Sequence, residues 1–517
     1  MLDLLKTRPL LVLAVIVGNI LLSAWCLSQD PVINNDGVTY IAIARLIVDG
    51  HWHQALDYYS WPYYPLLLAS VSKLLLIDLE LVAHGLNVFF IVVLSFGFIC
   101  IVSELAKQNL YEDKNRQRIV LIAALIIVLF PSITKYRSFI IRDFAYLSCY
   151  IWSLYFIFKY CFSGQLKHFF GWLVLAILGC LFRFESIAFV LMAPFFFFRV
   201  SKPNTQIRRP FLMLLVSLFV AVCVALFWWY ANDKYAATIA YAQNSGENID
   251  NLWDLFFANA VTENEQPYTF GIFIQQSISN LGTVAYELTR RMAVLYLIFA
   301  IAAYLKNLAL GKGAQKQIWL CYVFINVLIL LGFSFFNNFL VSRYTLVTAI
   351  TLLLLSPFAI HRFTEYLIAP NSLVKRTSLV FFILVLVGIS LEKLNIETDK
   401  LPRKEAGLWL SQNVAPDAKI FSTDKIINYY AGRNIEDTER TLQTYQSLKD
   451  AFFRKQIKSE DYIAFVTDFS IENQQIMWQT ITYHFGLPIK QIKIDDQNSV
   501  LIYSHHKSNL KTLNLRY

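Results

Sequence analysis

Apolar runs long enough to cross a bilayer recur along most of this 517-residue chain. A transmembrane helix needs about 20 consecutive apolar residues, and short polar or charged stretches separate the runs here. The pattern therefore predicts a polytopic α-helical membrane protein with about 11 transmembrane helices. The predicted spans lie near residues 9–27, 84–105, 119–133, 144–162, 169–182, 186–199, 211–230, 292–305, 318–336, 344–360 and 378–391.

The charges between these spans predict the orientation of the chain. Every second connection is basic, and the bias of Lys and Arg toward cytoplasmic loops places these connections, and the N-terminus, in the cytoplasm. The basic residues are Lys6, Arg8, Lys107, Lys114, Arg116, Arg118, Lys159, Lys167, Arg199, Lys202, Arg208, Arg209, Lys306, Lys312, Lys316, Arg362, Lys375 and Arg376. The segments predicted to face outward are 28–83, the turns at 142–143 and 183–185, the loop 231–291, the turn 335–344, and everything after 391.

The segment WPYYPLLLASVSKLLLI (61–77) is apolar but short for a span, and it contains Pro62, Pro65 and Lys73. If it crossed the membrane, every later basic loop would lie outside. We therefore predict an interfacial helix on the outer surface.

The tail, 392–517, has a different pattern. KEAGLWLSQNVAPDAKIFSTDKIINYYAGR suggests a helix, a Pro-Asp turn, a strand and a helix ending at Gly432. EDYIAFVTDF is strand-like, IENQQIMWQTITYHFG is helix-like, and QIKIDDQNSVLIYSHH is predicted to be a hairpin. Such a sequence predicts a small soluble α/β domain on the outer face. The predicted division is thus a membrane domain, 1–391, and a soluble domain, 392–517.

Composition supports the membrane assignment and narrows the chemistry. The chain is 57% hydrophobic and 16% charged, against about 25% charged in soluble proteins. The net charge of +9 comes from the loop Lys and Arg, so it predicts orientation and not nucleic-acid binding. The seven cysteines contain no CxxC pair, so neither a zinc site nor a disulfide framework is predicted. The sequence contains no phosphate loop, dinucleotide fingerprint or nucleophile elbow, so no cofactor is predicted.

Ionisable residues gather at the outer ends of the spans. Arg142-Asp143, Arg183-Phe184-Glu185 and Arg343-Tyr344 each lie beside apolar runs. Ionisable residues at membrane depth that face a cavity are candidates for function. A structural ion pair is the alternative, with Glu185 neutralising Arg183.

Asp36 lies in the first outer segment, after Asn34-Asn35 and before the helical pattern VTYIAIARLIV. An aspartate in this place is most often a helix N-cap. An ionised aspartate can also accept a proton from a hydroxyl, and a guanidinium matches the geometry of a phosphate. Together, outer arginines and isolated carboxylates suit a reaction on a lipid-linked phosphate.

Four segments carry a resemblance to a known family: NNDGVTYIAIA with SWPYYPLLL, YRSFIIRDFAYL, LGCLFRFESIAF and VSRYTLVTAITLLLLSP, followed by the tail that opens KEAGLWLSQNVAPDAKIF. In this order, the chain resembles the GT-C glycosyltransferases that use polyprenyl-phosphate sugars. It is similar to the bacterial aminoarabinose and protein O-mannosyl transferase group. The resemblance implies a bacterial inner-membrane enzyme that moves a sugar from a polyprenyl-phosphate donor to a lipid, glycan or protein acceptor. The reaction would take place on the periplasmic face.

The resemblance also implies roles for residues. It makes Asp36 the catalytic base, assisted by Asp143. Tyr40 and Glu185 would position the substrate. The candidates for binding the donor phosphate are Arg142, Arg183, Arg343, Tyr344 and Lys73. The chain departs from the family pattern, because Gly37 follows Asp36 where the mannosyl transferases have paired acids, and Thr39 stands where aminoarabinose enzymes often have arginine. The donor sugar is therefore not predicted.

The implied mechanism is direct displacement with inversion at the anomeric carbon. A flippase for lipid-linked sugar is the main alternative of another class, but it needs polar residues deeper in the spans. An O-antigen ligase or polymerase has similar chemistry, and a sensor or scaffold would leave the outer arginines without a purpose. No metal is predicted, although Asp36 and Asp143 could share a divalent cation if they converge.

Overall fold

The computed structural model describes residues 8–191, 270–311, 313–337, 339–368, 373–394, 400–416, 418–434, 462–467, 474–495 and 498–504. These residues form two compact units. The first comprises the described parts of Met1–Leu22, Asn87–Tyr136 and Arg142–Leu394. The second comprises the described parts of Ser23–Leu86, Arg137–Ile141 and Asn395–Tyr517. The predicted division at residue 391 stays a prediction.

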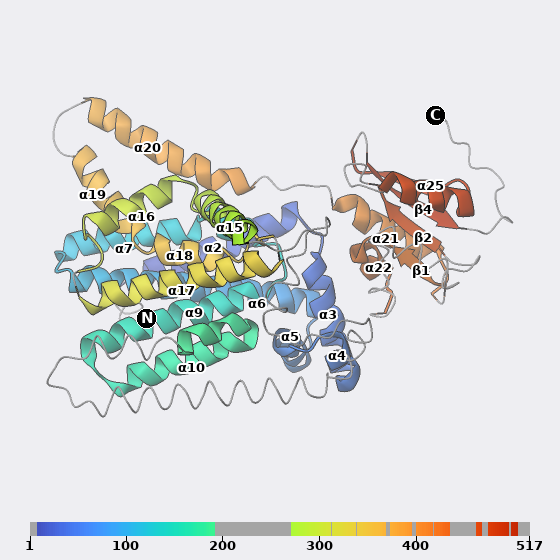
Figure 1. Ribbon diagram of the computed structural model, residues 1–517, viewed down its shortest axis with the longest axis horizontal. Coiled ribbons are helices and arrows are strands. Elements are labelled where there is room, and N and C mark those ends of the chain that lie inside the picture. The colour runs from blue at the N-terminus through green and yellow to red at the C-terminus, as the bar shows by residue number, and fades with distance from the viewer. Residues whose placement is uncertain are drawn as a thin grey trace. The chain divides into compact units, whose positions relative to one another are not determined.

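The first unit consists of helices (Figure 1). Its helices are α7 (Asp113–Val128), α8 (Pro131–Thr134), α9 (Asp143–Ser163), α10 (Leu166–Phe182), α15 (Phe270–Arg291), α16 (Leu295–Leu305), α17 (Ala314–Asn337), α18 (Leu346–Leu353), α19 (Ser356–Ile368) and α20 (Leu373–Leu391), with the short helices η1 (Phe184–Ser186) and η3 (Glu392–Leu394). Helices α2 (Pro9–Gln29) and α6 (Leu79–Gln108) contribute residues to both units.

Four helical segments among the described residues are long and apolar enough to cross a membrane: Pro9–Gln29, Leu79–Gln108, Asp113–Thr134 and Ala314–Phe335. The number rises to six if each of two bent pairs is one span. One pair, Gln275–Arg291 with Leu295–Leu305, bends by 101°, and the other, Leu346–Leu353 with Ser356–Ile368, by 43°. A polytopic membrane protein is thus confirmed, whereas the count of about 11 spans stays a prediction. The predicted span near 211–230 and most of that near 186–199 lie outside the described residues.

Close helix contacts and internal hydrogen bonds hold the first unit together. A Cβ added to Gly97 would lie 2.5 Å from the Ile151 side chain, so α6 and α9 approach closely there. The Trp152 indole donates to the Val93 carbonyl at 2.9 Å. Deeper in the unit, the Asn326 amide donates to the Tyr150 hydroxyl at 2.8 Å. Buried polar groups are stable in such places because they find hydrogen-bond partners.

The second unit contains three helices from the first predicted outer segment: α3 (Asn35–Val48), α4 (Trp52–Tyr58) and α5 (Tyr63–Leu75). Helix α5 has 13 residues and lies within the segment predicted to be interfacial. That length is too short to span a bilayer. Its interfacial placement stays a prediction.

The tail contributes helices and a four-stranded sheet to the second unit (Figure 1). Its elements are α21 (Leu401–Asn413), β1 (Ile420–Ser422), α22 (Lys425–Tyr430), β2 (Tyr462–Val466), α25 (Gln474–Phe485), β3 (Lys490–Lys493) and β4 (Ser499–Ser504). The strand order is β1-β2-β4-β3. Strands β1 and β2 are parallel, and β4 is antiparallel to both β2 and β3. These elements lie where the sequence pattern expects them, while their forming a separate soluble domain on the outer face stays a prediction.

Alternation along the strands gives the sheet two apolar faces. On one face, Ile420 and Ala464 pack with Leu410 of α21 and Ile427 of α22. The other face is covered by α25, whose buried Met477 and Ile481 pack with residues of β1, β2 and β4. The sheet is therefore a central layer between helices.

Candidate active site

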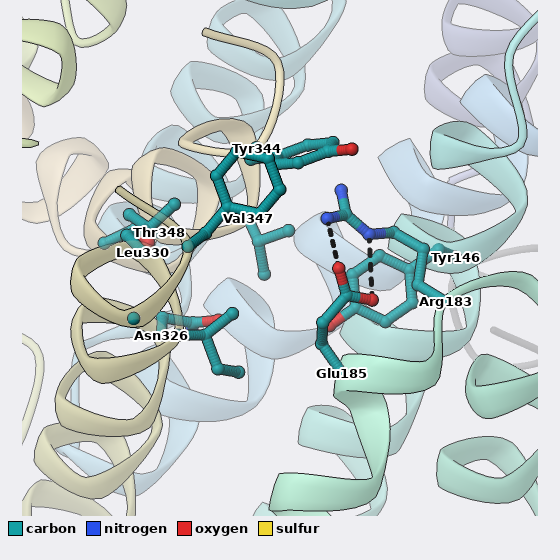
Figure 2. Close-up of a pocket in the computed structure, with 11 residues that line it drawn as sticks. Tyr146, Arg183, Glu185, Asn326, Leu330, Tyr344, Val347 and Thr348 are labelled. Carbon is teal, nitrogen blue, oxygen red and sulfur yellow. Dashed lines mark hydrogen bonds and ion pairs between the residues drawn. The ribbon is translucent and has the colours of Figure 1, made fainter. Parts of the chain in front are cut away.

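Arg183 is the central residue of a buried polar cluster in the first unit. It follows the last residue of α10 in an extended conformation (φ −144°, ψ 114°), and this turns its side chain toward the start of α9. Its Nη1 lies 2.8 Å from Oδ1 of Asp143, and its Nη2 lies 2.8 Å from Oε1 of Glu185. Figure 2 shows the paired contacts between Arg183 and Glu185. The expected partnership of these two residues is thus present, and Asp143 joins it.

The charges in this cluster support one another. Burial of the Arg183 guanidinium opposes its charge, but the carboxylates of Asp143 and Glu185 outweigh that cost and raise its pKa above the usual range. Burial alone would raise the pKa of Glu185, yet the Arg183 charge and hydrogen bond lower it. Arg183 and Glu185 are therefore both charged near neutral pH. A buried arginine held by two carboxylates is a fixed element of the site.

The segment before α18 adds a second arginine and an aromatic ring. The Tyr344 ring lies 4.0 Å from the Arg183 guanidinium carbon, which is cation–π contact. The Arg343 Nε lies 3.8 Å from Oδ2 of Asp143. Asp143 thus has an arginine near each of its oxygens, one in close contact and one at longer range. The Arg343 side chain is 22% exposed against 5% for Arg183.

A cavity of about 300 Å³ opens beside this cluster. Figure 2 shows Tyr146, Arg183 and Glu185 on one side and Asn326, Leu330 and Thr348 on the other. The full lining is Tyr146, Arg183, Glu185, Asn326, Ile329, Leu330, Gly332, Phe333, Tyr344, Val347 and Thr348. The Thr348 hydroxyl is buried and makes no hydrogen bond within the described protein. A cavity with apolar walls and a few placed polar groups is typical of a small-ligand site.

Arg291 is a buried cation that the sequence analysis did not single out. It ends α15 at the 101° bend, is only 4% exposed, and its Nε and Nη2 have no hydrogen-bond partner among the described residues. Its guanidinium lies 5.6 Å from the Tyr136 ring, and the Tyr136 hydroxyl is 3.2 Å from the Ser342 hydroxyl. The signal in the sequence was the Arg290-Arg291 pair directly before an apolar run, in a segment predicted to face outward.

Asp36 belongs to the second unit, in the first turn of α3. The N-cap position is Asn34, so Asp36 is not the cap residue. The Asn34 side chain instead binds the backbone of Ile140, accepting from its N–H at 2.8 Å and donating to its carbonyl at 3.3 Å. A Cβ on Gly37 would lie 3.0 Å from Cβ of Ile140, so glycine permits this close approach. Asp36 is partly exposed between these buried neighbours.

The other predicted site residues have different surroundings. Tyr40 is 6% exposed, with ring centres 5.8 Å from Tyr59 and 5.2 Å from Tyr64. Lys73 is exposed in the last turn of α5. Arg142 precedes Asp143 at the start of α9, and its charge contributes to lowering the pKa of Glu185.

The first unit therefore groups Asp143, Arg183, Glu185, Arg343 and Tyr344 at one site, with Arg142 next to it. Asp36, Tyr40 and Lys73 belong to the second unit. Within the described ranges, no three His, Cys, Asp or Glu side chains are grouped as a metal site. The roles assigned to these residues, and the expectation of no metal, stay predictions.

No family model and no curated protein matches the chain. Two solved structures match its fold over 95% of its length. The first is the oligosaccharyltransferase of Archaeoglobus fulgidus tethered to an acceptor peptide with the NVT sequon, at 12% identity, a TM-score of 0.50 and 74% of that chain. The second is apo ArnT, an aminoarabinose transferase, from Cupriavidus metallidurans, at 11% identity, a TM-score of 0.50 and 98% of that chain.

The chain shares the fold of these two solved structures. At these identities the likeness establishes the fold alone. It confirms the fold that the resemblance of the four sequence segments implied. The four to six apolar spans among the described residues agree with a membrane protein.

Proposed function

We propose that this protein is a membrane glycosyltransferase that moves a sugar from a polyprenyl-phosphate donor to an acceptor on the extracytoplasmic face. The observation that carries the proposal is the cluster of Arg183, Asp143 and Arg343 beside a cavity with a partly polar lining, within a GT-C fold. The membrane is the bacterial inner membrane, with the N-terminus cytoplasmic and the tail periplasmic. The acceptor is a lipid, a glycan or a protein.

Two arginines of the cluster have different parts in this proposal. Arg183 is already saturated by two carboxylates at 2.8 Å, so it positions Asp143 and supplies fixed positive charge. Arg343 contacts Asp143 only at 3.8 Å and is more exposed, so it can turn to a phosphate at lower cost. A guanidinium fork suits the oxygens of a departing phosphate. Arg343 is therefore the main phosphate ligand, with Arg142 and Lys73 as further candidates.

The cavity beside Arg183 would receive the sugar. Its polar groups include the Thr348 hydroxyl, which makes no hydrogen bond to the described protein, and the Asn326 side chain. Sugars combine hydroxyl groups with apolar ring faces, and aromatic side chains such as Tyr344 can stack on such faces. A cavity of about 300 Å³ is at the small end for ligand sites.

In the reaction, the acceptor hydroxyl or amine attacks the anomeric carbon from the face opposite the phosphate. Its proton passes to Asp36 as the new bond forms, and the bond from the anomeric carbon to the phosphate oxygen breaks. The electron pair remains on the polyprenyl phosphate, where the arginine charge stabilises it. Ile140 packs on Gly37 next to Asp36. Asp143 assists by orienting Arg343.

The decisive experiment is Asp36→Asn in the full-length protein. Removing a general base costs about 10²–10⁴-fold in rate, so transfer from a polyprenyl-phosphate sugar should be lost while the thermal unfolding midpoint is kept. Asp57→Asn is the matched control, because Asp57 is an exposed acid on α4 in the same unit. Transfer by Asp36→Asn at the wild-type rate would reject Asp36 as the base.

Flipping of a lipid-linked sugar is the rival function. The buried Tyr150 hydroxyl is hydrogen-bonded to the Thr351 hydroxyl at 2.6 Å and accepts from the Asn326 amide at 2.8 Å. Groups paired in this way suit packing better than passage of a headgroup. Scrambling of the donor across vesicles without any transfer would favour the flippase.

A further inference from the structure

Two helices of the tail contact the segment that carries Asp36. Both helices belong, with α3, to the second unit. From α22, the Lys425 ammonium donates to the Thr39 hydroxyl at 2.7 Å, and the Tyr430 hydroxyl accepts from the Ile33 N–H at 3.1 Å. These contacts lie on either side of Asp36 in the sequence.

Helix α21 and its N-cap residue contact the residues that precede α3 in the chain. Lys400 forms an ion pair with Asp30 at 2.9 Å, and Lys404 donates to the Pro31 carbonyl at 3.0 Å. Lys400 is the N-cap residue of α21, and Lys404 lies in the first turn of that helix. Asp30 is only 2% exposed in this pair. The chain entering α3 is therefore fixed before it reaches Asn34.

Helix α22 is itself firmly placed. The Asp424 side chain accepts from the Ile426 N–H at 2.9 Å as an N-cap, and Arg403 of α21 lies 2.9 Å from the same carboxylate. Tyr429, one turn after Lys425 on the same face, donates to Glu80 at 2.8 Å. Burial and the Glu80 carboxylate raise the pKa of Tyr429 above its usual range, so the hydroxyl keeps the proton that it donates.

The position of Lys425 relative to Asp36 follows from helix geometry. Asp36 and Thr39 are three residues apart on α3, and residues at this spacing are neighbours on one face. The Lys425 ammonium therefore binds the face of α3 that also carries Asp36. Ordering the long, flexible Lys425 side chain against a neutral hydroxyl costs conformational entropy. Packing of α22 against α3 does not by itself need this ordered lysine.

We infer that Lys425 of the tail is a positioning residue that fixes the first turn of α3 and, through it, the Asp36 carboxylate. The inference rests on the proposed role of Asp36 as the base. It makes the tail part of the catalytic apparatus, because the tail holds the base in place. A small displacement of a catalytic group can cost about 100-fold in rate.

The test uses the full-length protein in detergent, with Lys425→Met, the conservative Lys425→Arg, and Lys419→Met as a matched control. Lys419 is an exposed tail lysine directly before β1. Two quantities are measured: hydrogen exchange of peptides that cover residues 35–44, and kcat and KM for transfer. Lys425→Met should raise exchange at the start of α3 and lower kcat by about tenfold or more, with KM nearly unchanged. Lys425→Arg should restore both, and Lys419→Met should change neither.

Each other outcome counts against the inference. Unchanged exchange with unchanged kcat would show that Lys425 does not hold α3. A fall in kcat without a change in exchange, not rescued by arginine, would make Lys425 a substrate ligand. Raised exchange with unchanged kcat would show that ordering of the first turn of α3 does not affect the rate of transfer. Failure of the proposed base is distinguished by Asp36→Asn, which would then keep transfer whatever the exchange shows in the Lys425 variants.

Discussion

The pairing of Arg183 with two carboxylates gives a direct test of how the site is held together. The perturbation is Arg183→Met, which keeps much of the side-chain volume but removes the charge. The Arg183 and Asp143 side chains are 5% and 7% exposed. Removing one partner of a buried pair costs about 3–5 kcal/mol, because the remaining charge is left uncompensated. Glu185 is 33% exposed, so water screens it and it adds little to this figure.

We therefore expect Arg183→Met to lower the free energy of unfolding by about 3–5 kcal/mol. The assay is denaturant unfolding of the detergent-solubilised protein, followed by tryptophan fluorescence. Arg290→Met is the control, since Arg290 is 51% exposed and pairs with Glu287 at 3.3 Å, which is worth at most about 1 kcal/mol. Adding Asp143→Asn to Arg183→Met should recover about 1–3 kcal/mol, because the stranded charge disappears.

Acid should reduce the difference in the free energy of unfolding between wild type and Arg183→Met. The folded protein lowers the pKa of Glu185 through Arg183, so their pairing contributes stability above the unfolded value of about 4.3. That contribution is lost as the pH falls through the folded pKa. The small share of the stability difference that Glu185 contributes should thus disappear as the pH falls below about 4. A cost under about 1 kcal/mol at neutral pH, or full additivity with Asp143→Asn, would refute the account of a buried, mutually dependent cluster.

Two further predictions concern the neighbouring residues. Gly37→Ala should destabilise the protein by about 1–3 kcal/mol, because the added Cβ would lie 3.0 Å from Ile140. Gly282→Ala is the control in the unfolding assay and should not destabilise, because no other part of the described chain lies within 4 Å of the added Cβ. Arg343→Ala should weaken binding of polyprenyl phosphate by about 10-fold or more while changing stability little, since its contact with Asp143 is 3.8 Å long. Equal donor affinity in wild type and Arg343→Ala, measured on purified protein, would remove Arg343 from the phosphate site.

Local patterns in the sequence predicted most individual elements. The span expected at 144–162 corresponds to α9, Asp143–Ser163, and the span expected at 169–182 to α10, Leu166–Phe182. In the tail, the helix expected to end at Gly432 is α22, and the expected hairpin is β3 with β4. These features follow from helical and strand periodicity and from turn residues, which act over a few positions. The region of the expected span at 344–360 contains two helices, α18 and α19, which bend by 43° and together are long and apolar enough for one span.

The sequence by itself determined the class of protein: apolar runs require helices in a bilayer, and charges at their ends indicate where polar chemistry lies. It also identified Arg183, Asp143 and Arg343 as candidates, because ionisable groups beside apolar runs are costly at membrane depth unless they have a function or a partner. Only the tertiary structure decided which of them pair. Arg183 reaches Asp143 across 40 residues, at 2.8 Å, and the tail lysine Lys425 reaches Thr39 across 386, at 2.7 Å. Contacts at such separations depend on how whole helices pack, and no local pattern encodes that packing.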